Sequence, residues 1–90
     1  MKEIVIRKNI YDTSKQHKLV ETDVNGEYKF VPFADWCPLY LGYDNQTIVS
    51  FDSEGFGCPI CIGDAIGGKC VKKIYFKDNV GLIVVLENAD

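Results

Sequence analysis

Residues 70–87 have the sequence CVKKIYFKDNVGLIVVLE, and this stretch decides the fold class. The segments 70–76 and 80–87 are rich in β-branched and aromatic residues, and the turn-forming pair Asp78-Asn79 lies between them. This pattern predicts two antiparallel strands joined in a hairpin. The second segment is apolar on both faces, which is typical of a central strand or of a strand at a dimer edge.

A second hairpin is predicted around Asn25-Gly26, which separates the β-type segments 19–24 and 27–33. Both residues of the pair tolerate positive φ, so the pair predicts a type I′ turn. Residues 11–18 are polar and are predicted to form a loop. Further segments are typical of short strands: 3–10, 47–51 and 56–62.

The remaining patterns favour a mainly β fold. No stretch shows an apolar repeat of 3.6 residues, so no long helix is predicted, and Gly67-Gly68 indicates another turn. About six short strands predict a small antiparallel barrel or sandwich. The alternative is an α+β fold with one short helix, because Thr13 to Gln16 fits a helix-capping pattern. A length of 90 residues predicts one globular domain, residues 1–90.

Composition and charge limit the classes of partner. Apolar residues make up 47% of the chain and charged residues 26%, as is ordinary for a globular protein with a packed core. The acidic net charge of −3 argues against nucleic acid and anionic lipid as partners. The N-terminal residues lack the apolar stretch of a signal peptide, and the longest later apolar run, Leu82–Leu86, is too short to span a membrane. We therefore expect a cytoplasmic protein that binds neither nucleic acid nor membrane.

The segment 35–68 differs from the rest of the chain, because it contains no Lys or Arg. It carries Trp36, Tyr40 and Tyr43, and aromatic side chains on a loop held by a β scaffold are typical interface anchors. These three are the predicted binding residues, for a protein partner or a second copy of the chain. The alternative is that this irregular loop folds over the core. The segment also carries five acidic residues, and a partner that touches residues 35–57 is therefore expected to be basic; the five are Asp35, Asp44, Asp52, Glu54 and Asp64.

Four cysteines leave three hypotheses open: Cys37, Cys58, Cys61 and Cys70. Cys58-Pro59-Ile60-Cys61 is similar to the knuckle of zinc ribbons, and all four thiolates would then be the ligands of a structural zinc. A CxxC pair also suits thiol redox chemistry, but that chemistry needs a helix N-terminus or a nearby cation. If 56–62 is a strand, Cys58 and Cys61 point to opposite faces, and the cysteines pack as small hydrophobes. We expect this third arrangement, with Cys58 buried and with no metal, cofactor or disulfide.

Catalysis is not expected from this chain. His17 is the only histidine, and its polar neighbours Gln16 and Lys18 predict a solvated surface side chain. Nucleophilic catalysis of the Ser-His-Asp or Cys-His type would depend on this one residue. The sequence therefore predicts a non-enzymatic binding or interaction module. A zinc-stabilised domain and a thiol redox protein are the alternatives.

Overall fold

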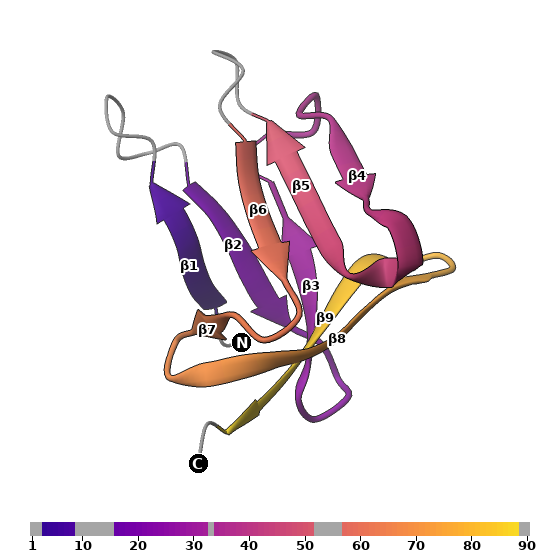
Figure 1. Cartoon of the computed structure of the whole chain (residues 1–90). Coiled ribbons are helices and arrows are strands. Elements are labelled where there is room, and N and C mark those ends of the chain that lie inside the picture. Colours follow the sequence, from indigo (N-terminus) through magenta and orange to yellow (C-terminus); the bar gives the residue numbers. More distant parts are fainter. Residues whose placement is uncertain (1–2, 9–15, 33, 52–56, 89–90) are drawn as a thin grey trace.

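The computed structural model describes residues 3–8, 16–32, 34–51 and 57–88, without the side chains of 6–8, 16, 57 and 58. Most of the described residues are in strands (Figure 1). The strands are β1 (Glu3–Lys8), β2 (Gln16–Glu21), β3 (Glu27–Val31), β4 (Leu39–Leu41), β5 (Thr47–Phe51), β6 (Gly57–Cys61), β7 (Ala65–Ile66), β8 (Lys69–Lys77) and β9 (Gly81–Asn88).

The prediction of a mainly β fold is confirmed. The described residues contain no α-helix, and their one helical turn is the 3₁₀ turn η1 (Tyr43–Asn45). The capping pattern that favoured the alternative α+β fold, Thr13 to Gln16, lies mostly outside the described residues; Gln16 begins β2. Within the described part of the chain, no helix has the length and apolarity that a membrane crossing requires.

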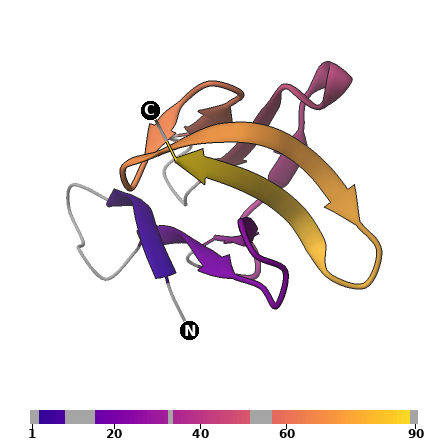
Figure 2. The same cartoon turned by 90° about the horizontal axis from the view of Figure 1, so that it is seen from below.

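The larger sheet curls into a nearly closed antiparallel barrel with the strand order β1-β2-β3-β9-β8-β7. In Figure 2 the long hairpin of β8 and β9 arches over the other strands. A bulge between Val71 and Lys73 helps β8 to bend in this way. The two edges of the sheet approach each other where Ile4 of β1 lies against Gly67, the residue that follows β7.

The core gathers side chains from both sheets. Its buried members are Leu19, Tyr28, Phe30, Ile48, Ile60, Ile66, Val71, Ile74, Leu82, Val84 and Leu86. β9 lies between β3 and β8, so of the two predicted positions, a central strand or a strand at a dimer edge, the structure has the first. Because side chains alternate along a strand, Ile83 lies on the opposite face from Val84, and yet it is fully buried there as well.

The smaller sheet has the order β4-β5-β6, and one of its faces packs on the core. Ile48 of β5 and Ile60 of β6 are buried in the core, and Leu39 and Leu41 of β4 pack against its margin. Tyr40, by alternation, lies on the outer face of this sheet. The small sheet thus closes one side of the core and exposes its other face.

Both predicted hairpins are present, but the turn at Asn25-Gly26 is not of type I′. Gly26 has a φ of +82°, whereas Asn25 keeps a negative φ. The N–H of Glu27 donates to the carbonyl of Val24 at 3.1 Å, and positive φ at the third position alone is typical of a type II turn. The type I′ pattern occurs instead at Gly67-Gly68, where both φ values are positive, +57° and +80°.

The predicted surface location of His17 is wrong. Residues 16–18, predicted as loop, belong to β2, where His17 lies opposite Arg7 of β1. Since His17 is two residues from the core residue Leu19, it points to the same side of the sheet. It is buried, and its ring stacks on Phe30 with 5.9 Å between ring centroids.

Candidate functional site

The three predicted binding residues lie on and beside β4, and all three are exposed. Trp36 lies in a turn that is closed by a hydrogen bond from the N–H of Cys37 to the carbonyl of Ala34. Tyr40 is in β4, and Tyr43 is the first residue of η1. Their exposed fractions are 59%, 58% and 90%, in that order. None of the three aromatic rings is folded into the core. We call these three residues the β4 surface.

The exposure of Tyr43 follows from the backbone of the β4–β5 connection. Asp44 and Asn45 both adopt positive φ, +58° and +56°, which short polar side chains tolerate better than others. The N–H of Gly42 donates to the carbonyl of Thr47 at 2.6 Å and closes this loop. The loop thereby carries Tyr43 beyond the end of the small sheet.

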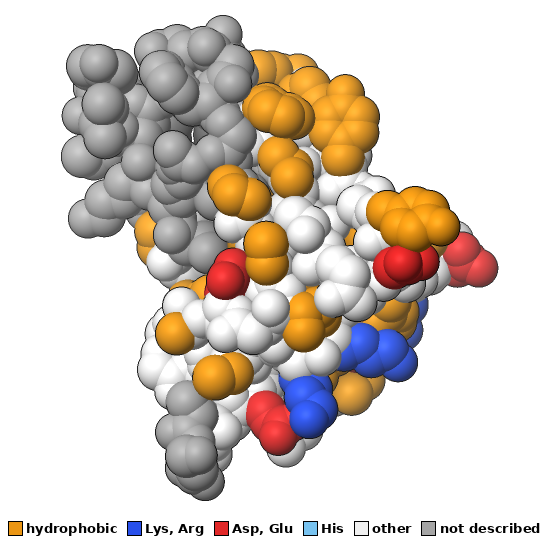
Figure 3. All heavy atoms as spheres, in the orientation of Figure 1, with side chains coloured by type: hydrophobic (Ala, Val, Ile, Leu, Met, Phe, Trp, Pro, Cys, Tyr) orange, Lys and Arg blue, Asp and Glu red, His pale blue; other side chains and the backbone are white. Residues whose placement is uncertain are grey.

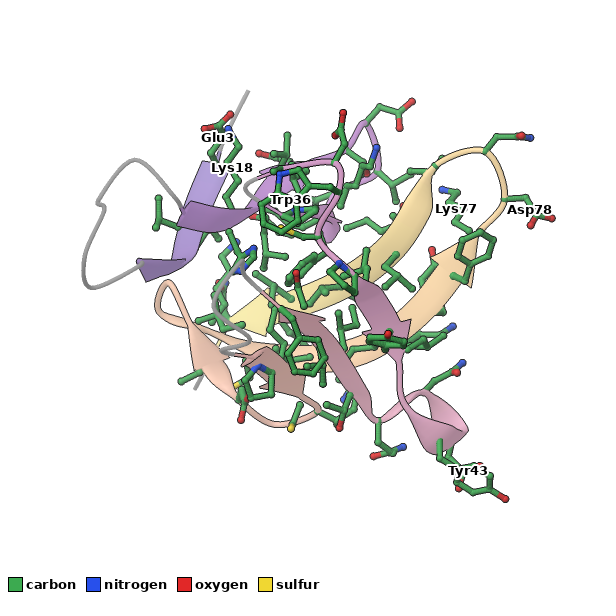
Figure 4. The ribbon with its side chains drawn as sticks, turned by 90° about the horizontal axis from the view of Figure 1, so that it is seen from above. Glu3, Lys18, Trp36, Tyr43, Lys77 and Asp78 are labelled. Atoms are coloured by element: carbon green, nitrogen blue, oxygen red, sulfur yellow. The ribbon has the colours of Figure 1, made fainter. Side chains whose placement is uncertain are left out.

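The three aromatic residues do not form one cluster. Figure 4 shows Trp36 and Tyr43 well separated, and β4 lies between them in the chain. Tyr40 has a different aromatic neighbour, Phe51 of β5, in an edge-to-face arrangement with 5.9 Å between centroids. The β4 surface is therefore a row along one strand, with a supported ring at its middle and an exposed ring beyond each end.

Acidic residues accompany the two ends of this row. Asp35 precedes Trp36 and Asp44 follows Tyr43, and both acids are exposed. In Figure 3 orange apolar side chains gather over β4 and β5, red carboxylates lie near η1, and blue Lys side chains lie lower, toward β8. Of the other three acids, Asp64 follows β6, and Asp52 and Glu54 lie outside the described residues.

The three cysteines with described side chains lie on different parts of the fold. Cys37 is buried before β4, Cys61 is on β6 and Cys70 is on β8; the last two are half-buried thiols. The hydroxyl of Thr47 donates to Cys61 Sγ at 3.5 Å. The Cys58 backbone pairs with Ser50 in the sheet, but its side chain, which was predicted to be buried, lies outside the described residues. Among the described residues, no three His, Cys, Asp or Glu side chains come together as a group that could hold a metal ion.

One polar cluster was not predicted from the sequence. Glu27 of β3 is buried, and its carboxylate accepts a hydrogen bond from the hydroxyl of Tyr75. Lys77 Nζ lies 3.1 Å from Glu27 Oε2, and the Thr22 hydroxyl lies 3.5 Å from the same oxygen. Lys73 Nζ lies 5.0 Å from the centroid of the Tyr75 ring. The sequence gives no sign that this glutamate, which follows a turn, is buried. Its partners on β8 are about half the length of the chain away in sequence.

No protein-family model matches the chain, and no curated protein or solved structure is similar to it.

Proposed function

We propose that this protein is a non-enzymatic interaction module that binds a basic protein partner through the β4 surface. One observation carries the proposal: three large aromatic side chains are exposed along a single short strand and its flanks. Aromatic residues of this kind are enriched among the residues that contribute most to binding.

Charge supports the choice of a basic partner. The segment 35–68, which includes the whole β4 surface, contains no Lys or Arg. Asp35 and Asp44 extend from its ends into solvent. Complementary charge steers association and disfavours wrong partners, so nucleic acid and anionic membrane fit this surface poorly.

The absence of catalysis and the cytoplasmic location belong to the same proposal. The single histidine, His17, is buried against Phe30, so it is poorly placed to act on a substrate in solution. A reducing compartment suits a chain in which Cys61 and Cys70 are thiols.

Photo-crosslinking tests this function. A photoreactive phenylalanine analogue at position 43 captures the partner in cells, and the captured protein is then purified and titrated with the unmodified chain. We expect Tyr40→Ala and Trp36→Ala each to weaken binding by about tenfold or more, as for residues that contribute strongly to binding. Circular dichroism checks that each variant keeps its fold.

Phe76 provides a matched control, because its side chain has the same exposed fraction as Trp36, 59%, but lies on β8. Phe76→Ala is expected to leave the affinity unchanged. An equal loss in Phe76→Ala, or no loss in Tyr40→Ala and Trp36→Ala, would contradict the proposal. A captured protein with an acidic contact surface would contradict its electrostatic part.

A further inference from the structure

The open edge of β4 is unlike the other edges of this protein. β4 pairs with β5 on one side, and no described strand pairs with its other side. Unpaired edges invite a further strand, so proteins usually protect them. Here the edges of the barrel approach each other at Ile4 and Gly67, and the small sheet is left with two edges, β4 and β6.

The β6 edge is blocked by two local features. The N–H of Ile62 donates to the carbonyl of Gln46, so the backbone N–H and C=O of Ile62 point toward β5. Because these directions alternate along a strand, the N–H and C=O of Ile60 point the same way. Pro59 and Cys61 therefore face the open side of β6. Pro59 has no N–H, and the N–H of Cys61 already donates to Asp64 Oδ2 at 2.8 Å. A new strand would find few donors there.

The β4 edge carries no such block. The carbonyl of Pro38 accepts a hydrogen bond from the N–H of Phe51, and the N–H of Gly42 donates to the carbonyl of Thr47. The backbone hydrogen-bonding groups of residues 38, 40 and 42 therefore point toward β5. Leu39 and Leu41 alternate with these residues, so their backbone N–H and C=O groups point away from β5. No hydrogen bond to the N–H or C=O of either leucine occurs within the described part of the chain. Each leucine can thus offer one donor and one acceptor to an added strand.

We infer that the β4 edge binds an extended basic peptide segment of the partner as an additional β-strand; this inference rests on the proposed function. The backbone groups of Leu39 and Leu41 hold the peptide, as in other cases of strand addition. A peptide residue opposite Tyr40 lies on the outer face of the sheet beside the Tyr40 ring. An arginine at this position can stack on the ring, and its neighbours in the peptide cover the half-buried Leu39 and Leu41.

A second copy of the chain fits this edge less well. In an antiparallel pair of β4 strands, the end of β4 nearer Asp35 in one copy lies beside the end nearer Asp44 in the other. Like charges are then placed together at both ends of the pair, which disfavours it. A peptide segment that carries Lys or Arg on both sides of its central residues instead places positive charge near Asp35 and Asp44. For this reason we assign the edge to a basic partner.

A designed peptide tests the inference. The probe is acetyl-Thr-Lys-Val-Arg-Val-Lys-Thr-amide, in which the two valines are to lie opposite Leu39 and Leu41. Trp36 is the only tryptophan, so its fluorescence and the amide signals of β4 report binding. We expect saturable binding, and no binding of the same peptide with Glu in place of Lys and Arg.

Backbone methylation separates strand addition from simple surface contact. N-methyl groups on both valines remove the donors that face β4, and binding should weaken by about tenfold or more. A peptide methylated on the arginine and the following lysine is the matched control and should bind like the parent. In the protein, Leu41→Pro removes an outward N–H and should abolish binding, whereas Leu41→Ala keeps that N–H and should retain most of it.

Each other result overturns the inference. If both methylated peptides bind equally, or if no basic peptide binds at millimolar concentration, β4 does not accept a basic strand. If both methylated peptides bind equally but Tyr40→Ala still weakens their binding, the β4 surface binds the peptide without strand addition, and the proposed function survives. A dimer in sedimentation experiments that Leu41→Pro dissociates would assign the edge to a second copy instead.

Discussion

The hydroxyl of Tyr75 on β8 donates a hydrogen bond to the carboxylate of Glu27 on β3, although β9 lies between the two strands. Lys77, also on β8, forms an ion pair with the same carboxylate at 3.1 Å. Glu27 is only 7% exposed, and a buried charge is costly unless it is paired and hydrogen-bonded. The β8 partners therefore hold in place a charge that would otherwise oppose folding.

Tyr75→Phe is predicted to destabilise the protein by about 1.5–3 kcal/mol, the usual range for a hydrogen bond to a charged group. The substitution keeps the ring and removes only the donor to Glu27. Urea unfolding followed by circular dichroism measures the change in the free energy of unfolding.

Lys72→Ala is the control for this prediction. Lys72 forms an ion pair with Glu87 at 3.6 Å, but both side chains are largely exposed, so the loss should stay below about 1 kcal/mol. Equal effects of Tyr75→Phe and Lys72→Ala would show that the Glu27 carboxylate gains nothing from the tyrosine.

Gly67→Ala is predicted to destabilise the protein more than Gly68→Ala. Both positions have positive φ, which costs a residue with a side chain about 1–2 kcal/mol. A Cβ at Gly67 would also lie 3.1 Å from Ile4 Cγ2, whereas a Cβ at Gly68 would have no described atom within 4 Å. Thermal unfolding measures the stability of each variant. Because the backbone penalty is similar at the two positions, the difference between the variants reports the contact with Ile4.

The Ile4 contact can be tested separately. If the approach of β1 to Gly67 causes the extra loss, Ile4→Ala should reduce the difference between Gly67→Ala and Gly68→Ala. Identical stabilities of the two glycine variants in the wild-type background would mean that this contact contributes nothing.

The elements predictable from the sequence are those whose signals are local. Asp78-Asn79 gave the β8–β9 hairpin, because Asn79 readily adopts the positive φ of +67° that the turn needs. The apolar residues on both faces of β9 left two positions open, and β9 takes the first of them, a central strand rather than a strand at a dimer edge.

Features that depend on distant residues were missed. β4 has only three residues, too few for a periodic pattern, and it becomes a strand by pairing with β5. His17 is buried because β2 turns it toward the core and Phe30 covers its ring. Glu27 is satisfied by a tyrosine 48 residues away in the chain. Polarity at a single position does not reveal such partners.

Ser50→Ala is predicted to stabilise the protein by about 1 kcal/mol. Ser50 of β5 is fully buried, and its hydroxyl has no hydrogen-bond partner among the described residues. A buried hydroxyl without a partner costs free energy that alanine avoids. Urea unfolding gives the difference, and Ser50→Cys, which fills the space with a less polar atom, is the control for packing. A clear loss of stability in both variants would contradict the prediction.

The cysteines should differ in their reactivity in the folded protein. Cys61 and Cys70 are half-buried thiols, whereas Cys37 is buried before β4. We expect a small alkylating reagent to modify Cys61 and Cys70 without denaturant, and Cys37 only after unfolding. Peptide mapping by mass spectrometry assigns each modified position. Modification of Cys37 at the rate of Cys61 in the native state would contradict its burial.

Chelation is predicted to leave the melting temperature unchanged. A structural zinc contributes about 10 kcal/mol or more to small domains that need it, so its removal would be obvious in a thermal melt. Cys61 accepts a hydrogen bond from Thr47, as a thiol packed in a sheet can do without a metal. Elemental analysis of protein purified without chelator is the companion measurement. One equivalent of zinc per chain, together with unfolding on chelation, would reverse the prediction and make Cys37, Cys58, Cys61 and Cys70 the expected ligands.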